Sequence, residues 1–215
     1  MAILHIEMPP KRIIVLTAFS VFLVLFYTVW SDTSYFLYII WNIFLAFLPF
    51  LISSNLLWYK NQGKFGTPIF IFGLLVWLAL FPNAPYLVTD LIHLGANPSV
   101  PFIFDFLILF ISAWVGMYLG VYSLFHVEEI FFDKYGKKIT NSLLFVIILI
   151  SSFGIYIGRF LRWNSWDVFL RPGYLVKDIS EVVNHPHNYP EAYVSTAVFF
   201  VFITLSYLVW KKIKK

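Results

Sequence analysis

The sequence predicts an all-α integral membrane protein, a single domain spanning residues 1–215 and built as a polytopic bundle of about six transmembrane helices. Two observations lead to this prediction: 60% of the residues are hydrophobic against 12% charged, and the hydrophobic residues occur in long runs. A soluble domain is closer to half apolar and a quarter charged. The excess of large apolar side chains is explained if lipid covers them instead of a protein core.

Six apolar runs are the predicted spans, and most reach the roughly 20 residues that a helix needs to cross the hydrocarbon. They cover 13–30, 36–58, 67–82, 101–126, 139–161 and 193–210. The third run is short and ends in the sequence FPNAP at 81–85. Each proline removes an amide donor and disfavours helix in the residue before it. We therefore expect the third span to be broken at Pro82–Pro85 and to continue as a short apolar piece at 86–94.

The distribution of Lys and Arg predicts the orientation of these spans. With six crossings, eleven of the 15 basic residues fall on the side of the N-terminus and four on the other side, whereas the 11 acidic residues divide four to seven. The side richer in Lys and Arg is the cytoplasmic one. We therefore expect both termini in the cytoplasm, and the basic clusters beside apolar spans do not indicate a nucleic-acid partner.

The predicted outer loop at 163–193 contains a segment with helical periodicity. Its apolar residues recur at Leu175, Val176, Ile179, Val182 and Val183, with charged residues between them. This pattern favours a short helix lying in the outer membrane interface. An ordinary surface helix on the bundle is the alternative.

Asp90 and His93 are the first candidates for chemistry, with Asn83 upstream of them as a candidate substrate contact. Three residues apart, Asp90 and His93 share one face of a helix, where a carboxylate and an imidazole can share a divalent metal or act as an acid–base pair. His185 and His187 in the outer loop could complete a metal shell with His93 and an Asp. The alternatives are a wet polar cap and an ordinary turn. A divalent metal is the only cofactor that these residues indicate.

Asp105 lies about one turn inside the fourth predicted span. An ionisable residue inside an apolar span costs on the order of 3 kcal/mol, so it normally has a partner or a function. The expected partner is Arg159 or Arg162, which share a helical face at the end of the fifth span. Two interpretations stay open: Asp105 is a catalytic carboxylate, or an ion pair with one of these arginines locks two helices together.

Arg159, Arg162, Asn164 and Asp167 also form a candidate binding site for a lipid head group. Arg grips phosphate bidentately, and Trp163 beside it is suited to an interfacial anchor. Arginines that extend to the interface beside a tryptophan belt, without any ligand, are the alternative.

Two glycine pairs with the spacing of close helix contacts lie at Gly116/Gly120 and Gly154/Gly158. Glycines four apart let a neighbouring backbone approach. In the predicted topology they lie in opposite halves of the membrane, so we expect each pair to receive a bulky neighbour of its own. Either pair could instead serve a homo-oligomer or a larger membrane complex.

Three strings carry a resemblance to a known family: WNIFLAFLPF, LALFPNAPYLVTDLIHL and GIYIGRFLRWNSWD. They resemble a family of bacterial predicted membrane proteins catalogued only as a domain of unknown function, number thirteen sixty-one. The similarity extends from about Trp41 to Pro172. It implies a multi-pass protein of the bacterial plasma membrane and implies no activity.

These observations support three hypotheses for function. The first is a membrane-embedded hydrolase or transferase acting on a lipid or lipid-linked substrate at the outer leaflet, with Asp90, His93 and Asp105 catalytic. No haem, flavin or iron–sulfur motif points to redox chemistry. The second is a non-catalytic scaffold or a subunit of a larger membrane complex, in which the polar cluster holds the helices together. The third is a small transporter, suggested by the broken third span.

Overall fold

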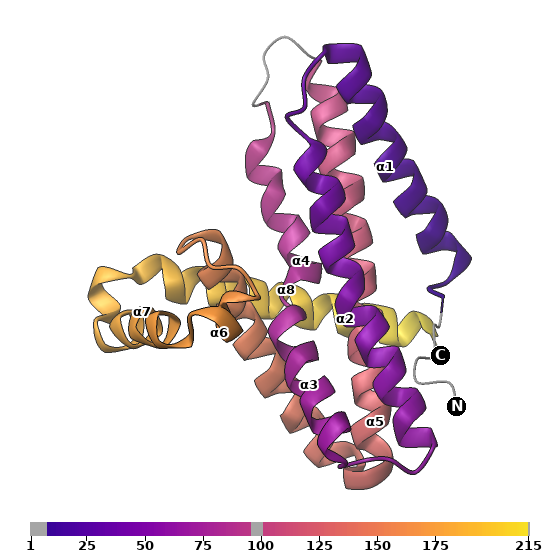
Figure 1. Ribbon diagram of the computed structural model, residues 1–215, viewed down its shortest axis with the longest axis vertical. Helices are drawn as coiled ribbons and strands as arrows, with labels where there is room; N and C mark the ends of the chain where they lie inside the picture. The colour runs from indigo at the N-terminus through magenta and orange to yellow at the C-terminus, as the bar shows by residue number, and fades with distance from the viewer. Residues whose placement is uncertain (1–7, 96–100, 215) are drawn as a thin grey trace.

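The computed structural model describes residues 8–95 and 101–214, and every regular element in this part of the chain is a helix (Figure 1). In chain order the elements are α1 (Lys11–Ser31), α2 (Leu37–Asn61), α3 (Pro68–Leu80), α4 (Asn83–Tyr86), the 3-10 helix η1 (Leu87–His93), α5 (Phe102–Arg159), α6 (Asp167–Leu170), α7 (Pro172–Asn184), the 3-10 helix η2 (Pro186–Asn188) and α8 (Pro190–Lys214). Five helical stretches among these residues are long and apolar enough to cross a membrane. They are Lys11–Ser31, Leu37–Asn61, Pro68–His93, Phe102–Arg159 and Pro190–Ile213.

The longest stretch, α5, contains both the fourth and the fifth predicted spans. Its 58 residues are helical except at Gly136, whose φ of 69° and ψ of 176° break the helix into two arms, 102–135 and 137–159. Because only a residue without Cβ adopts this conformation readily, Gly136 turns the chain in a single step. The residues between the fourth and fifth predicted spans are thus also helical on both sides of the kink. At 1.5 Å per residue the first arm is about 50 Å long, which exceeds the thickness of the hydrocarbon.

The third predicted span is interrupted at the predicted prolines, but the chain keeps its helical direction. The α-helix α3 ends at Leu80. Pro82 nevertheless has φ −56° and ψ −26°, and Tyr86 also stays in the right-handed helical region. The segment continues through α4 into the tighter η1, so that Pro68–His93 forms one long rod (Figure 1).

The first arm of α5 is the central element of the bundle. Its buried face packs against α1, α2 and the α4–η1 segment, and small hydroxyl residues on it join the neighbouring helices. Ser112 lies 2.7 Å from Ser20 of α1 between their hydroxyl oxygens. Ser123 accepts a hydrogen bond from the Trp77 indole at 2.6 Å and donates one to the carbonyl oxygen of Pro49 at 3.0 Å. This side of α5 is thereby fixed against three different helices.

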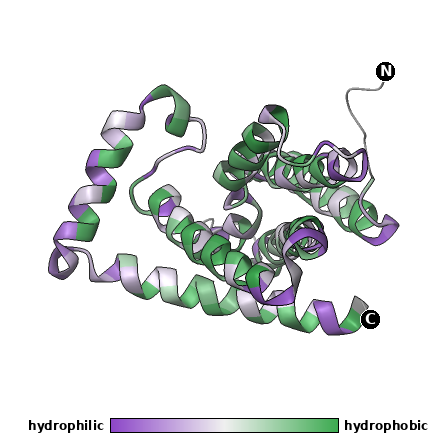
Figure 2. Ribbon diagram, turned by 90° about the horizontal axis from the view of Figure 1, so that it is seen from below, coloured by the Kyte–Doolittle hydropathy of each residue, from purple (hydrophilic) through white to green (hydrophobic). Residues whose placement is uncertain are grey.

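The C-terminal helix α8 runs obliquely across the bundle and contacts both arms of α5 (Figures 1 and 2). On the first arm, the ring centroids of Tyr118 and Trp210 are 4.5 Å apart, and Glu128 forms an ion pair with Lys211. On the second arm, the ring centroids of Phe145 and Phe200 are 4.9 Å apart. The short helices α6 and α7 lie to one side of the bundle. The helix expected in the outer loop is thus present as α7, which carries apolar and polar residues along its length (Figure 2).

Candidate functional site

The first glycine pair receives α4, the short helix that leads into the candidate site. A Cβ on Gly116 would lie only 2.3 Å from the carbonyl oxygen of Ala84 and 2.7 Å from a methyl carbon of Leu87. At Gly120 a Cβ would make ordinary contacts, the shortest 3.4 Å to Ala84. The backbone of α4 therefore rests directly on the first arm of α5, and only glycine at position 116 allows it.

The second glycine pair receives the same segment from the other arm of α5. A Cβ on Gly154 would lie 2.9 Å from the ring of Pro82, and one on Gly158 would lie 3.5 Å from the ring of Tyr86. Each pair does receive a neighbouring segment, but it is the same one, residues 82–87, held between both arms. The expectation of a separate neighbour for each pair is wrong, because both pairs lie at the level of this segment. Because these glycines contact the chain's own α4 segment, the structure gives no support to an oligomer contact through them, which stays a prediction.

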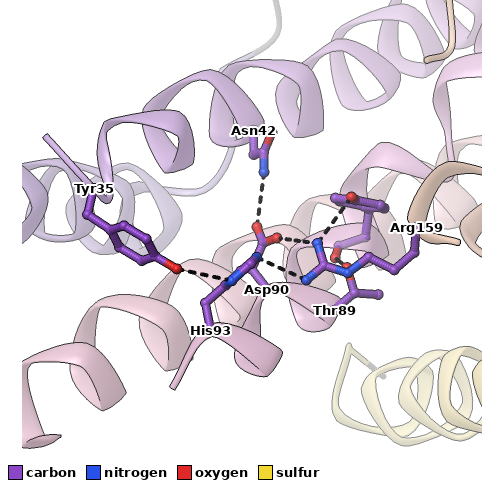
Figure 3. A network of polar contacts seen from close by, with 7 residues as sticks. Tyr35, Asn42, Thr89, Asp90, His93 and Arg159 are labelled. Atoms are coloured by element: carbon purple, nitrogen blue, oxygen red, sulfur yellow. Dashed lines mark hydrogen bonds and ion pairs between the residues drawn. The ribbon is translucent and has the colours of Figure 1, made fainter. Parts of the chain in front are cut away.

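Asp90 projects from η1 into the space between α2 and the end of α5 (Figure 3). It is buried, with 1% of its surface exposed. One carboxylate oxygen accepts a hydrogen bond from the Asn42 side-chain amide at 3.0 Å. The other carboxylate oxygen accepts from the Arg159 guanidinium at 3.3 Å, and the two groups form an ion pair. Both oxygens are thus engaged, and the buried negative charge has a positive partner.

Arg159 connects Asp90 to His93 and Tyr86. The guanidinium donates to the Tyr86 hydroxyl at 3.3 Å and contacts Nε2 of His93 at 3.1 Å. Since a guanidinium carries no acceptor, Nε2 of His93 must accept, which places the proton of the neutral imidazole on Nδ1. Nδ1 lies 3.3 Å from the hydroxyl of the exposed Tyr35 (Figure 3). The network therefore runs from the surface at Tyr35 to the buried carboxylate of Asp90.

Four residues of this site escaped the sequence analysis: Tyr35, Tyr38, Asn42 and Tyr86. The centroid of the Tyr38 ring lies 5.7 Å from that of His93, and its buried hydroxyl has no hydrogen-bond partner among the residues that the structure describes. Two of the four were detectable. Asn42 is one of only two side-chain amides in the apolar run 36–58. Tyr86 precedes Asp90 by four residues, which places these two on one face of a helix.

Asp105 lies apart from this network, which makes the expected ion pair with Arg159 or Arg162 wrong. Its side chain is fully buried, at 0% exposure, and its carboxylate lies near the backbone amide of Gly95. Within residues 8–95 and 101–214, no side chain forms a hydrogen bond or ion pair with it. Arg159 pairs with Asp90 instead. The physical reason is that the continuous α3–α4–η1 rod places Asp90 beside the end of α5, where Arg159 lies.

A pocket of about 1080 Å³ lies beside the network, between α2, α3, the second arm of α5 and the segment from α6 to α7. Its walls are mostly apolar and aromatic. The polar side chains among its lining include Asn42, Asn83, Arg159, Arg162, Asn164 and Ser165. Asp90, His93 and Asp105 do not line it. The predicted arginines and asparagines thus gather at one pocket, and Asp90 and His93 lie behind it, in contact with Arg159.

The loop that follows α5 is fixed by side-chain hydrogen bonds. The side-chain amide of Asn83 contacts the Ser165 hydroxyl with both of its polar atoms. Its nitrogen lies 2.9 Å from the hydroxyl oxygen as a donor, and its oxygen lies 3.2 Å away as an acceptor. Asp167 is buried and accepts from the backbone of Asn164 at 2.9 Å and from Arg171 at 2.7 Å. These hydrogen bonds, the one from the Asn164 backbone foremost, hold the pKa of Asp167 below its ordinary value. Asp167 thus stabilises this loop and does not line the pocket, and its role in substrate binding stays a prediction.

The metal shell expected from four residues does not form. In the described ranges 8–95 and 101–214, no three His, Asp or Glu side chains gather closely enough to hold a metal ion. His185 ends α7 and lies 3.2 Å from the Glu181 carbonyl oxygen, and His187 lies in η2. The Arg159 guanidinium contacts both Asp90 and His93, and a positive charge there opposes a cation. A metal held by Asp90 and His93 alone stays a prediction.

Five apolar helical stretches and a polar network buried between them define a multi-span helical membrane protein with a pocket inside its bundle. The chain belongs to the family described as protein of unknown function (DUF1361), whose model matches residues 41–207. The family resemblance noted in the sequence is thereby confirmed. Among curated proteins and among solved structures, no significant match was found.

Proposed function

We propose that the chain binds a lipid or lipid-linked molecule at the outer leaflet of the bacterial plasma membrane, with its apolar part in the pocket and an anionic head group at the arginines. One observation carries this proposal: the pocket combines apolar walls with two arginines and several side-chain amides. A ligand that fits such a lining is itself apolar over most of its length and polar at one end.

The finer form of the proposal is that the chain hydrolyses or transfers a group of this ligand. His93 is the group of the network that could act as a general acid or base, since its imidazole is held between Arg159 and Tyr35; it lies behind the wall of the pocket, next to Arg159. Asp90 would orient the arginine next to it. Asp105 has no hydrogen bond or ion pair to these residues, so its predicted catalytic role has no geometric support.

A second candidate function is that of a non-catalytic membrane scaffold. It is favoured because both carboxylate oxygens of Asp90 already have partners within the chain. With Asn42 on one oxygen and Arg159 on the other, this carboxylate joins α2, η1 and α5 without needing a ligand. The scaffold and the lipid-binding protein differ in what the pocket holds, so the test must address the pocket itself.

The test is to fill the pocket and measure which lipids the purified protein retains. Ala79 lines the pocket, and Ala79→Trp adds a large side chain to it. Ala197→Trp is the matched control, because Ala197 is exposed on α8 and outside the pocket. Native mass spectrometry of protein extracted in mild detergent should show a lipid bound to the wild type and to Ala197→Trp, and much less bound to Ala79→Trp. Equal retention by all three proteins would reject the proposal.

We further propose six crossings with both termini in the cytoplasm, the two arms of α5 crossing separately. The excess of Lys and Arg on one side of the predicted spans supports this orientation. Since the chain has no cysteine, single cysteines at Lys138 and Lys177 would each be a unique thiol. A membrane-impermeant thiol reagent added to intact cells should label the cysteine at 177 and not the one at 138. The reverse pattern, or equal labelling, would contradict the topology.

A further inference from the structure

The two arginines of the pocket differ in how much of their binding capacity is still available. Arg159 already contacts Asp90, His93 and Tyr86, and Asp90 balances its charge. Arg162 also lines the pocket and is exposed, and no hydrogen bond or ion pair joins it to the residues that the structure describes. A ligand phosphate would therefore find a free guanidinium at Arg162 and an occupied one at Arg159.

The backbone of Arg162 is in a conformation that residues with a Cβ rarely adopt. Its φ is +59°, and besides Asp32 it is the only non-glycine residue with positive φ among residues 8–95 and 101–214. Glycine takes this left-handed conformation freely, whereas an arginine is strained in it. Such strain persists only where the surroundings impose it, and it gathers at ligand-binding positions.

The surroundings of Arg162 do impose this conformation. The backbone amide of Trp163 closes the turn by donating to the Ile157 carbonyl oxygen at 3.3 Å. The indole N–H of Trp163 donates to the Asp178 carboxylate of α7 at 2.9 Å. With Ser165 joined to Asn83, the loop is fixed on both sides of the strained residue. Arg162 is thus presented at the pocket by a rigid loop, which reduces the entropy lost when a ligand binds.

The remaining lining of the pocket indicates the chemistry of the head group. Within the described residues no Asp or Glu lines it, whereas the side-chain amides Asn42, Asn83 and Asn164 and the Ser165 hydroxyl do. A ligand amine would find no carboxylate there, while ligand hydroxyls would find donors and acceptors. Resting on the proposed function, we infer that the pocket selects a lipid with one anionic phosphate and a hydroxylated, uncharged remainder of the head group, and that Arg162 is the residue that binds this phosphate.

Binding of defined lipids to the full-length protein in detergent tests this inference. The probes are phosphatidylglycerol, whose head group has one phosphate and two hydroxyls, and phosphatidylethanolamine with the same acyl chains, whose head group has an amine. Native mass spectrometry measures the bound fraction of each. The wild type should prefer phosphatidylglycerol by about tenfold, which corresponds to roughly 1.4 kcal/mol.

Arg162→Gly is the decisive variant, because it removes the guanidinium and relieves the backbone strain together. The preference for phosphatidylglycerol should fall to near one, while the melting temperature stays equal or rises. Lys177→Ala is the matched control: it removes one positive charge from α7, outside the pocket, and should keep the preference. Arg162→Lys should retain only part of it, because an ammonium does not bind phosphate bidentately.

The outcomes separate this inference from the proposed function. A wild type that binds both lipids equally, with binding blocked by Ala79→Trp, would overturn the inference and leave the proposed function standing. Loss of the preference in both Arg162→Gly and Lys177→Ala would show an effect of net charge and also overturn it. A preference that survives in Arg162→Gly, with a lower melting temperature, would make Arg162 a structural residue. No binding of either lipid by the wild type would count against the proposed function itself.

Discussion

Asp90 and Asp105 are two carboxylates buried in apolar helices, and they differ in their partners. Asp90 is 1% exposed and engaged by Asn42 and Arg159. Asp105 is 0% exposed, and in the part of the chain that the structure describes its carboxylate lies near the backbone amide of Gly95 and contacts no charged side chain. Placing an ionisable residue in an apolar span costs a similar amount in both cases. Of the two, only Asp90 has a counter-charge among the described residues to offset that cost. Burial of an acidic residue in a membrane helix therefore does not by itself identify a paired or functional residue.

Removing the carboxylate of Asp90 should cause the largest loss of unfolding free energy. It tests whether the ion pair with Arg159 stabilises the fold. Asp90→Leu leaves the half-buried Arg159 guanidinium without a counter-charge, which we expect to cost about 3 kcal/mol of unfolding free energy. Equilibrium unfolding in mixed micelles measures this value. The double variant Asp90→Leu/Arg159→Met removes both charges and should recover most of the loss. A double variant as unstable as the single one would show that the charge pair is not the cause.

Displacing α4 from α5 should cause the second largest loss of unfolding free energy. This change leaves both Asp90 and Asp105 in the chain. Gly116→Ala brings a methyl group to 2.3 Å from a backbone oxygen of α4, so we expect a loss of about 3 kcal/mol or more. Gly120→Ala is the matched control, since its nearest contact is an ordinary 3.4 Å, and it should cost less than about 1 kcal/mol. The same unfolding measurement applies. Equal costs at the two glycines would mean that α4 yields and does not hold Asp90 in place.

The sequence predicted the helices and most of the site residues, because apolar runs, prolines and lone polar residues are local signals. It predicted the wrong partner for Arg159 and missed Tyr35, because partners are set by packing between distant segments. Choosing between Asp90 and Asp105 required knowing that helix continues through Pro82. A proline often ends a helix, but here Pro82 and Tyr86 keep right-handed helical φ and ψ, so the chain keeps its direction through α4 into η1. The positive φ of Arg162 likewise could not be predicted from the sequence, because arginine rarely adopts this conformation.

Neutralising Asp105 should have a much smaller effect than removing Asp90. Asp105→Asn keeps the size of the side chain and an oxygen that can still accept from the backbone amide of Gly95, and it breaks no ion pair with the residues that the structure describes. We expect the free energy of unfolding to change by less than about 1 kcal/mol, because no charged partner is left behind. Asp90→Asn is the control and should be clearly more destabilising. If the two asparagine variants prove equally unstable, Asp105 has a partner in the membrane and the contrast between the carboxylates fails.

Asp167 is a third buried carboxylate, and its effect should be confined to one loop because it lies outside the spans. Its pKa is lowered from 3.8 by hydrogen bonds from the backbone of Asn164 and from Arg171, so the folded chain binds a proton there less readily than the unfolded chain. Its stabilising contribution is therefore present above pH 3.8 and is lost as the pH falls through the lower folded pKa. Asp167→Asn should increase amide hydrogen exchange at 163–171 at neutral pH, and this difference from the wild type should disappear in strong acid. Faster exchange across α2 and α5 as well would show that the loop is coupled to the Asp90 network, and the contrast between local and global carboxylates would then need revision.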